Sequence, residues 1–430
     1  MRTSLAFIAV TIFFVAIFFG PAGTVSYAEA ATCSPAGDTG LTAAVVAISN
    51  QMITGTINAA GCDIGIYVGP GIEAVIANAT VTGANDHGIL VQDTNNTVIE
   101  NSLITANGVS PYTACPFGTA STPSKPCIAN NYEVLLVGTS HALVKGNTVS
   151  YNPADGGITV ADDGPANPGA PNPGTPHQSV GNIITNNLIE NNIPGCGINV
   201  ASYNSGPNAG AVGNIITGNI VLGSTPDVGL YNGQIVIAAN APNTVISDTV
   251  ISGNIVDGSV LPGIAVHANA PGDVISNTTI ENNLISNNGY YPASFATPNT
   301  PTVSNGTVGI SLVAETAPGM PSPPSITGTS IVSNTILNDK YGVWTCNTAS
   351  TNIMDLLGNA SVPMIDCHAS SLSMPSTTVM TSEMPSTSIG QNPSIGPNLI
   401  LAALIIIAVI IAVIVIGVLA AVWRKRGNPQ

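Results

Sequence analysis

The chain has few charged residues and almost no basic ones. Only 7% of its 430 residues are charged, and seven Lys and Arg stand against 22 Asp and Glu, which gives a formal net charge of −15. No arginine occurs between Arg2 and Arg424, and the same interval contains only three lysines, Lys125, Lys145 and Lys340. Such a surface repels phosphate backbones and therefore argues against a nucleic-acid partner.

Other absences limit the chemistry. Aromatic residues make up 4% of the chain, and its seven cysteines include no CxxC pair, so the sequence does not support a zinc cluster. The five histidines show no paired ligand spacing. Serine, histidine and aspartate are too diffusely placed to predict a catalytic triad.

The middle of the chain carries a pattern that returns seven times. It reads Ile/Val-x-x-Asn-x-aliphatic, and its asparagines are Asn101, Asn147, Asn187, Asn219, Asn254, Asn283 and Asn334. A second pattern, Gly-Ile/Val-x-(Val/Leu/Thr), alternates with it and starts at Gly65, Gly88, Gly157, Gly197, Gly263, Gly309 and Gly342. Aliphatic and polar residues alternate with strand period, so the repeats predict a solenoid of short strands. Rungs stacked about 4.8 Å apart then form parallel sheets.

The repeated asparagines fit sharp corners between the sheets. Asparagine tolerates the left-handed backbone conformation, and identical amides stacked rung upon rung can bond to one another. We therefore expect an internal asparagine ladder, although solvated turn residues would produce the same spacing.

Two stretches carry a resemblance to a known family. They are GILVQDTNNTVIENSLITANG at 88–108 and GIAVHANAPGDVISNTTIENNLISNNG at 263–289. With them the chain resembles the right-handed parallel β-helix proteins of the pectin-lyase-like superfamily over roughly residues 60 to 350. The resemblance implies an all-β, right-handed parallel β-helix of about nine rungs. It does not imply one chemistry, because this fold hosts lyases, hydrolases, esterases, epimerases and adhesins.

The first part of the chain divides into a leader, a cap and the solenoid. Residues 1–30 have a basic start, an apolar run and an Ala-x-Ala site, as in a secretory signal peptide, with an uncleaved anchor as the alternative. Residues 31–63 are expected to cap the solenoid, with a short helix over 39–50. The β-helix proper is expected at 64–346 and a second cap at 347–368.

The last part of the chain predicts a membrane anchor. Residues 369–397 are rich in Ser, Thr, Pro and Met, which is typical of an extended stalk. Residues 398–423 contain 24 uninterrupted apolar residues, enough to cross a bilayer once. The basic residues in 424–430 favour a cytoplasmic tail, so the solenoid is expected outside the cell.

An exported chain permits disulfides. Neighbour pairing predicts Cys33–Cys62, Cys115–Cys127 and Cys346–Cys367, although sequence alone leaves the connectivity open. Cys196 is left over and is expected to be a small buried residue.

The enzymes that the resemblance suggests need residues that are scarce here. Pectate lyases of this fold combine Ca²⁺-binding acids with an Arg or Lys base, and polygalacturonases combine clustered Asp and His with an Arg-x-Lys signature. The chain has Asp162-Asp163 and Asp86-His87-Gly88 but lacks that basic signature.

Two acidic columns are the candidate chemical sites. Alignment of the rungs on the Gly-Ile strands superposes Asp63, Asp86 and Asp155, with Asn131 between the last two, as a candidate Ca²⁺ site. The same alignment places Asp93 and Asp162 two rungs apart, about 9–10 Å, at the upper edge for an inverting glycosidase pair. These two residues, with Asp163, are the candidate catalytic residues. The alternative for both columns is that aspartate is a common turn residue.

The few aromatics after the leader gather in two long loops. Tyr112 and Phe117 belong to the first loop, and Tyr290, Tyr291 and Phe295 belong to the second. Aromatic faces in exposed loops can stack on sugar rings, which makes these residues candidate glycan-binding groups. The alternative is that they pin their own loops to the solenoid wall.

These observations favour a membrane-anchored extracellular β-helix that acts as a recognition, adhesion or structural module, with a polysaccharide or cell-surface glycan as the candidate ligand. The alternative is an extracellular polysaccharide hydrolase or lyase. The two differ in whether carboxylates converge on one place.

Overall fold

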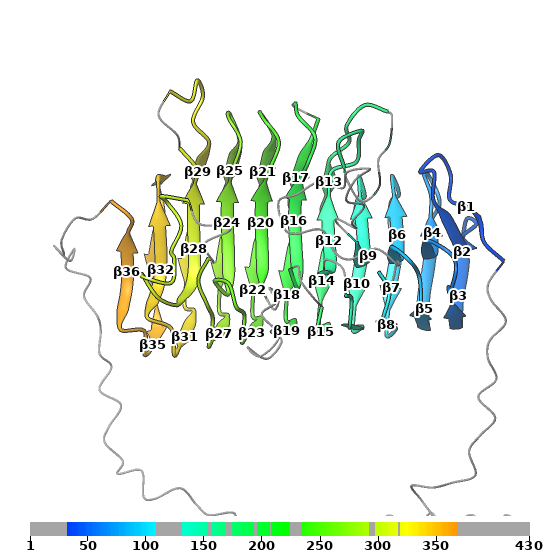
Figure 1. Ribbon diagram of the computed structural model, residues 1–430, viewed down its shortest axis with the longest axis horizontal. Helices are drawn as coiled ribbons and strands as arrows, with labels where there is room; N and C mark the ends of the chain where they lie inside the picture. Colours follow the sequence, from blue (N-terminus) through cyan, green and yellow to red (C-terminus); the bar gives the residue numbers. More distant parts are fainter. Residues whose placement is uncertain are drawn as a thin grey trace, which may run out of the picture. The chain divides into compact units, whose positions relative to one another are not determined.

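The computed structural model describes residues 32–108, 131–153, 156–167, 170, 172, 174–192, 196–206, 208–223, 234–291, 297–316 and 319–368. All of these belong to one compact unit within residues 1–370. They form strands and turns without a helix (Figure 1). In this part of the chain no helix is long and apolar enough to cross a membrane. The expected leader, stalk and anchor lie outside the described residues.

Three sheets run along the solenoid. The first is a 12-stranded sheet, called sheet A: β1 (Ser34–Pro35), β2 (Thr42–Val46), β4 (Ile64–Val68), β6 (His87–Gln92), β9 (Tyr132–Val137), β12 (Gly156–Ala161), β16 (Ile198–Ser202), β20 (Ile235–Ala239), β24 (Ile264–Ala268), β28 (Val308–Ala314), β32 (Tyr341–Cys346) and β36 (Val362–Asp366). Figure 1 shows these strands side by side in chain order.

The second sheet, sheet B, has 18 strands, two in most rungs. They are β3 (Gln51–Asn58), β5 (Ala74–Thr82), β7 (Val98–Glu100), β8 (Leu103–Thr105), β10 (Leu143–Lys145), β11 (Thr148–Ser150), β14 (Ile183–Thr185), β15 (Leu188–Glu190), β18 (Ile215–Thr217), β19 (Ile220–Leu222), β22 (Val250–Ser252), β23 (Ile255–Asp257), β26 (Thr279–Glu281), β27 (Leu284–Ser286), β30 (Ser330–Val332), β31 (Thr335–Leu337), β34 (Asn352–Met354) and β35 (Leu357–Gly358).

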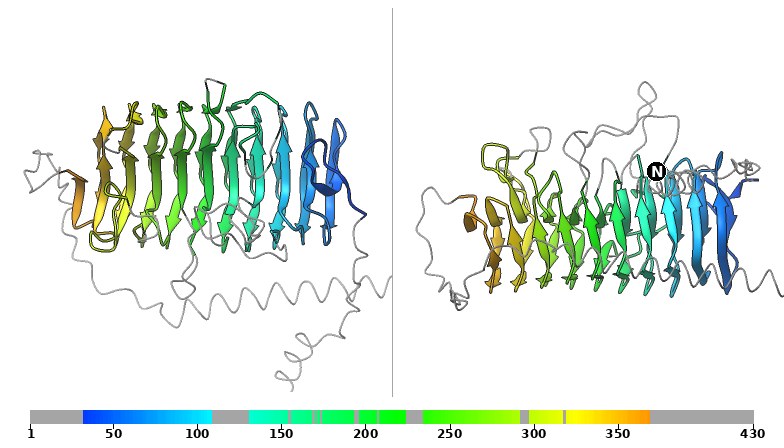
Figure 2. Two further views of the ribbon diagram at one scale, coloured as in Figure 1. Left: turned by 45° about the horizontal axis from the view of Figure 1, so that its top comes forward. Right: turned by 90° about the horizontal axis from the view of Figure 1, so that it is seen from below.

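A third, six-stranded sheet C completes the rungs: β13 (Ser179–Val180), β17 (Gly210–Val212), β21 (Val245–Ser247), β25 (Val274–Ser276), β29 (Ser325–Thr327) and β33 (Thr348–Ala349). A complete rung therefore runs from sheet A through sheet C to the two strands of sheet B. Apart from β1, which is antiparallel to β2, the paired strands are parallel. Figure 2 shows the rungs stacked in sequence order.

The interior is a set of aliphatic columns, one residue per rung. In sheet A, Ile158, Ile198 and Ile235 are paired across adjacent strands and fully buried. Burial of such a side chain contributes about 2–3 kcal/mol. These columns belong to one continuous core that extends from Ala47 to Val343.

The glycine that starts each Gly-Ile strand is required by close packing between rungs. A Cβ atom added to Gly157 would lie 2.5 Å from the carbonyl oxygen of Gly197 in the next rung and 2.8 Å from Ile189. The regular glycines of the second sequence pattern thus mark places where neighbouring backbones leave no room for a side chain.

Six of the seven repeated asparagines form a buried ladder at the corner within sheet B. The Asn187 Nδ2 atom donates to Asn219 Oδ1 at 2.9 Å and to the Val144 carbonyl at 2.9 Å. The Asn219 Oδ1 atom also accepts the Asn187 backbone N–H at 3.0 Å. The same bonds repeat down the column of Asn147, Asn187, Asn219, Asn254, Asn283 and Asn334.

Asn101 is not in the ladder, contrary to the sequence prediction. Its neighbour Ser102 occupies the ladder position, and the Ser102 backbone N–H donates to Asn147 Oδ1 at 2.9 Å. Asn101 is exposed and has φ 49°, like Asn186 at φ 54° in the corresponding place. The left-handed residue of the corner therefore precedes the ladder residue, and the alignment on Asn101 was shifted by one.

Further ladders line the other corners and were not predicted. Asn192 Oδ1 accepts the backbone N–H of Asn152 at 3.1 Å at the end of sheet B. Asn182 Nδ2 donates to Asn214 Oδ1 at 2.9 Å between sheets C and B. All four residues are buried. Buried amides therefore bond rung to rung at three corners.

The predicted caps are rungs of the solenoid. The predicted helix over 39–50 is wrong, because β2 lies there and pairs with β4. At the other end, β34 pairs with β30 and β36 pairs with β32, so residues 347–368 continue the stack. The solenoid is consequently longer than the predicted nine rungs.

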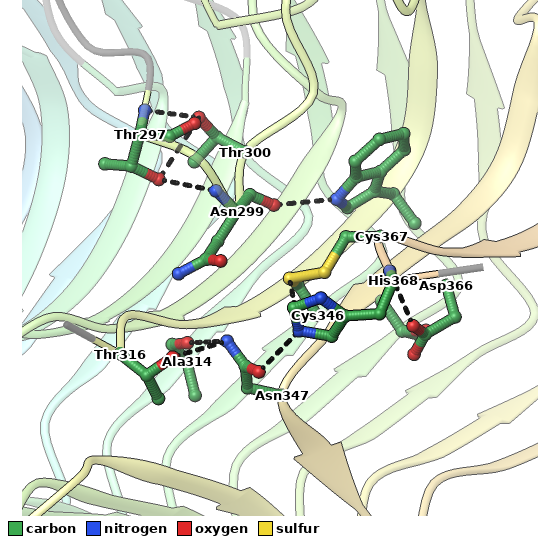
Figure 3. The surroundings of a disulfide bond; sticks show 12 residues. Thr297, Asn299, Thr300, Ala314, Thr316, Cys346, Asn347, Asp366, Cys367 and His368 are labelled. Carbon is green, nitrogen blue, oxygen red and sulfur yellow. Dashed lines mark hydrogen bonds between the residues drawn. A yellow bond between two sulfur atoms is a disulfide. The ribbon is translucent and has the colours of Figure 1, made fainter. Parts of the chain in front are cut away.

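Disulfides tie both ends of the stack. Cys33 is bonded to Cys62, and Cys346 is bonded to Cys367, as predicted. Figure 3 shows the second bond, where His368 Nε2 lies 2.8 Å from Asn347 Oδ1. The predicted Cys115–Cys127 pair lies outside the described residues.

Candidate functional site

Two aspartates and a histidine meet where sheet A ends. Asp93 follows β6, and Asp163 follows β12. One carboxylate oxygen of each and one ring nitrogen of His177 all lie within 4.8 Å of one another. His177 Nδ1 is 3.1 Å from Asp93 Oδ1. Asp163 is fully buried, whereas the side chains of Asp93 and His177 are 17% and 55% exposed, so the cluster opens to solvent at its His177 side.

Local backbone geometry brings these residues together. Asp163 and His177 form an antiparallel bridge in which each backbone N–H donates to the other's carbonyl, at 2.9 and 3.1 Å. The intervening rung places Gly138 between the two aspartates. A Cβ atom there would lie 2.4 Å from Asp93 Oδ1 and 2.8 Å from Asp163 Cβ. The absence of a side chain at Gly138 therefore lets carboxylates from two non-adjacent rungs converge.

Neutral polar side chains hold the two carboxylates in place. Asn172 Nδ2 donates to both Asp93 and Asp163. Gln92 Nε2 donates to Asp163 Oδ1 at 3.2 Å, and Gln92 Oε1 accepts the Tyr67 hydroxyl at 3.1 Å. Sequence reasoning missed Asn172, Gln92 and His177, because Asn172 and His177 lie in a Pro- and Gly-rich segment without period and Gln92 has no distinguishing pattern.

The carboxylates disfavour each other's charge. Burial raises the pKa of Asp93 to about 6, and the hydrogen bond with Asp163 and its charge act in the same direction. The hydrogen bond and charge of His177 oppose this rise. The pKa of Tyr67 is raised to about 12, mainly by burial and then by the charge of Asp163. The site therefore holds a proton near Asp93 under mildly acidic conditions.

Asp162, the other residue of the predicted catalytic pair, points away from this site. Its carboxylate accepts the backbone N–H groups of Tyr203, Asn204 and Gly210 in the next rung, at 2.8, 3.1 and 3.0 Å. Burial raises the pKa of Asp162 to about 6, against these hydrogen bonds. Asp162 thus anchors a turn, and Asp163, one position later, is the partner of Asp93.

Within the described residues the predicted Ca²⁺ column keeps its predicted register, and its side chains are hydrogen-bonded to neighbouring groups. Asp63 aligns with Asp86, and Asn131 Nδ2 donates to Asp86 Oδ1 at 3.3 Å. Asp63 Oδ2 accepts the N–H and hydroxyl of Thr42 at 2.8 and 2.7 Å. Mainly burial raises the pKa of Asp86. Asp155 lies outside the described residues.

Within the described ranges, three metal-binding side chains come together at two places. One is Asp93, Asp163 and His177, whose atoms could hold a cation. The other is Cys346, Cys367 and His368, but its sulfur atoms are joined in the disulfide.

Of the predicted glycan-stacking aromatics, Tyr112, Phe117 and Phe295 lie outside the described residues. Tyr291 is buried and packs edge-on against His267 of β24, with ring centroids 6.2 Å apart. It therefore pins its segment to sheet A and offers no free face for a sugar. Tyr290 is partly exposed.

A further carboxyl group lies wholly inside the solenoid. Glu133 of β9 accepts hydrogen bonds from the backbone N–H and the side-chain amide of Asn107. Burial raises the pKa of Glu133 from 4.5 to about 8. The folded chain therefore keeps a proton there that the unfolded chain loses above pH 4.5.

This difference predicts a pH-dependent stability. Because the folded state binds the extra proton, the contribution of Glu133 to stability is complete below pH 4.5. As pH rises towards 8, the free energy of unfolding falls by up to about 1.4 kcal/mol per pH unit. Glu133→Gln should flatten this slope in thermal melts between pH 5 and 9. Glu100→Gln on sheet B is the control, and an equal slope in wild type and Glu133→Gln would contradict the assignment.

Comparison with known proteins supports the fold. Residues 42–246 match the family model described as "Right handed beta helix region". No curated protein matches the chain. Among solved structures, a surface adhesin of Streptococcus pneumoniae, PfbA, aligns with 12% identity and TM-score 0.43, over 78% of this chain and 74% of that one.

Two similar structures are those of enzymes. An endo-xylogalacturonan hydrolase from Aspergillus tubingensis has 9% identity and TM-score 0.35, over 75% of this chain and 86% of that one. A polygalacturonase from Erwinia carotovora ssp. carotovora has 11% identity and TM-score 0.36, over 75% and 86%. Identities this low concern the fold and not the activity. With its three parallel sheets and corner ladders, the described part of the chain has the fold of a right-handed parallel β-helix repeat protein.

Proposed function

We propose that the chain is an exported, membrane-anchored β-helix that cleaves an uncharged polysaccharide by acid–base catalysis. The observation that carries this proposal is the convergence of Asp93 and Asp163, with carboxylate oxygens within 4.8 Å, at a partly exposed place beside sheet A. Glycoside hydrolysis commonly uses two carboxyl groups, one protonated and one ionised.

In this proposal Asp93 is the proton donor. Its pKa of about 6 keeps it protonated in mildly acidic solution, and its exposure lets it reach a glycosidic oxygen. Asp163 stabilises the positive charge that develops on the sugar ring as the glycosidic bond breaks, and a water molecule then bonds to the anomeric carbon and releases its proton to the solvent. The two carboxyl groups share a hydrogen bond, so they lie closer together than the about 5–5.5 Å of retaining enzymes and the about 6.5–9.5 Å of inverting ones, and we expect them to act as one hydrogen-bonded pair. His177 is a positioning residue that orients Asp93.

The expected polymer is uncharged because the described residues bring no lysine or arginine to the site to hold an anionic one. The described residues include two lysines: Lys145 lies on sheet B, and Lys340 Nζ donates to the Asn305 carbonyl. A polyuronate would also meet a net charge of −15. The proposed export and membrane anchoring are inferred from the sequence patterns of residues 1–30 and 398–423.

The test is polymer cleavage by the purified full chain in detergent. Uncharged glucans, mannans and xylans and acidic polyuronates are incubated between pH 4 and 8, and new reducing ends and chain length are followed. We expect an uncharged polymer to shorten, faster as pH falls through about 6. A chelator should have no effect, and an effect would favour a cation at the site.

If no polymer gains reducing ends, the catalytic proposal fails. Co-elution of the chain with an uncleaved polymer would then support a recognition or adhesion module, the function that the sequence favoured.

A further inference from the structure

Two cysteines and a histidine meet in the last rungs of the stack. Cys346 is the last residue of β32, Cys367 directly follows β36, and these two strands are neighbours in sheet A. The Cα atoms of the two cysteines are 5.2 Å apart, and His368 Nε2 lies 4.0 Å from Cys346 Sγ. The group has no short spacing in the sequence, because the stacking of two rungs brings its members together.

The backbone holds the two cysteines together independently of the bond between their sulfur atoms. Strands β32 and β36 are paired from Tyr341 to Thr345, and the Cys367 backbone N–H donates to the Thr345 carbonyl at 2.9 Å. When the disulfide is reduced, the sulfur atoms therefore remain on adjacent rungs and separate by side-chain rotation alone. Two thiolates bound at about 2.3 Å to a tetrahedral zinc ion are about 3.8 Å apart, a separation that rungs about 4.8 Å apart accommodate.

The imidazole of His368 is oriented by Asn347. The Asn347 Nδ2 atom donates to the Ala314 carbonyl at 2.9 Å and to Thr316 Oγ1 at 3.1 Å, so the Oδ1 atom of the same amide faces the imidazole. His368 Nε2 lies 2.8 Å from Asn347 Oδ1 (Figure 3), and it must donate the proton of this bond because an amide oxygen only accepts. The His368 backbone N–H donates to Asp366 Oδ1 at 2.9 Å. A held nitrogen and a held oxygen thus lie beside the sulfur atoms.

We propose that Cys346, Cys367 and His368 bind a zinc ion when the chain is reduced. The fourth ligand is Asn347 Oδ1. Two thiolates, one imidazole and one oxygen are a mixed set that tetrahedral zinc accepts, and the two thiolates balance the charge of the ion. Zinc takes the position of the proton between His368 Nε2 and Asn347 Oδ1, and the neutral imidazole then carries its proton on Nδ1. Zinc and the disulfide are thus alternative ways to tie β36 to β32.

Zinc binding requires a dithiol reductant, because both sulfur atoms are joined in the oxidised chain. Cys367 is partly exposed whereas Cys346 is fully buried, so the dithiol attacks Cys367 Sγ, and Cys346 leaves as a thiolate beside His368. The second sulfur atom of the reductant then displaces Cys367, and the reductant becomes a cyclic disulfide. Two electrons pass to the chain, and the two thiol protons of the reductant are released to the solvent as the thiolates bind zinc.

Alkylation of the full chain in mild detergent tests the proposal. The chain is reduced with dithiothreitol and freed of it, iodoacetamide is added with and without Zn²⁺, and each modified cysteine is quantified by mass spectrometry. Cys33, in the disulfide at the other end, is the matched control, because Cys33 and Cys367 are both partly exposed. We expect Zn²⁺ to slow alkylation of Cys367 by about ten-fold or more and that of Cys33 by less than about two-fold, since a bound thiolate is a poor nucleophile. Equal protection of both cysteines, or of neither, would overturn the proposal.

Cobalt reports the ligand set directly. Co²⁺ added to the reduced chain should give thiolate-to-cobalt charge-transfer absorption and tetrahedral d–d bands, and Zn²⁺ should remove them. His368→Gln, at an exposed position, should weaken Co²⁺ binding by about 100-fold or more, since even an outer partner of a metal ligand contributes about 10–100-fold. Cys33→Ser with Cys62→Ser should leave the spectrum unchanged. A spectrum that survives Cys346→Ser with Cys367→Ser, or binding that is unaltered in His368→Gln, would contradict the assignment.

Discussion

Replacement of Asn219 by alanine is expected to lower the free energy of unfolding by about 3–5 kcal/mol. The Asn219 amide makes four buried hydrogen bonds, two accepted from Asn187 and one donated to each of Ile184 and Asn254. Alanine would leave buried donors and acceptors without partners, and each such group costs about 1–3 kcal/mol. Water that enters the new space should recover part of this loss.

The effect should also be local, because each rung contacts only its neighbours. Hydrogen exchange should increase most in β14, β15, β18 and β19, and urea unfolding should become broader. Asn186→Gly is the matched control, since Asn186 is exposed and has the left-handed φ that glycine accepts. We expect the control to stay within about 0.5 kcal/mol of wild type. Similar destabilisation by both variants would show that the ladder contributes little.

Asp93→Asn should reduce polymer cleavage about 1,000-fold at pH 5, because the amide cannot donate the proton that a carboxylic acid supplies. Asp163→Asn should act differently. It removes the charge that raises the pKa of Asp93, so the rate should begin to fall at a lower pH than in the wild type. The maximal rate should also be lower. The measurement is the initial rate of reducing-end formation from pH 4 to 8.

Asp248→Asn is the control for these variants. Asp248 is an exposed turn residue with φ 56°, a conformation that asparagine also adopts, so its activity and melting should match the wild type. If Asp93→Asn keeps most of the activity while the chain remains folded, Asp93 is not the proton donor.

The sequence predicted the solenoid well because its period is set by the backbone. One aliphatic residue per strand and one glycine per close approach recur in every rung, and such columns are visible without coordinates. The ladder was predicted for Asn147 onward for the same reason. At Asn101 it failed because Ser102 can accept the same hydrogen bond, and a pattern of asparagines does not reveal a serine in its place.

The candidate site was predicted only in part. Rung alignment paired Asp93 with Asp162, whereas the structure brings Asp93 together with Asp163. In an extended strand neighbouring side chains point to opposite faces, so an error of one residue reverses the direction of the carboxylate. The pairing also depends on Gly138 and on the bridge between Asp163 and His177, and neither has a periodic signal.

The corner ladders also bear on the chemical stability of two Asn-Gly bonds. An asparagine followed by glycine loses its amide when the glycine nitrogen attacks the side chain, which requires a flexible backbone. Asn107–Gly108 and Asn288–Gly289 are such pairs, yet both asparagines are buried, and the glycine N–H groups donate to the carbonyls of Ala84 and Leu261. Deamidation at these two bonds therefore requires a rung to open locally, so the closed stack should slow it.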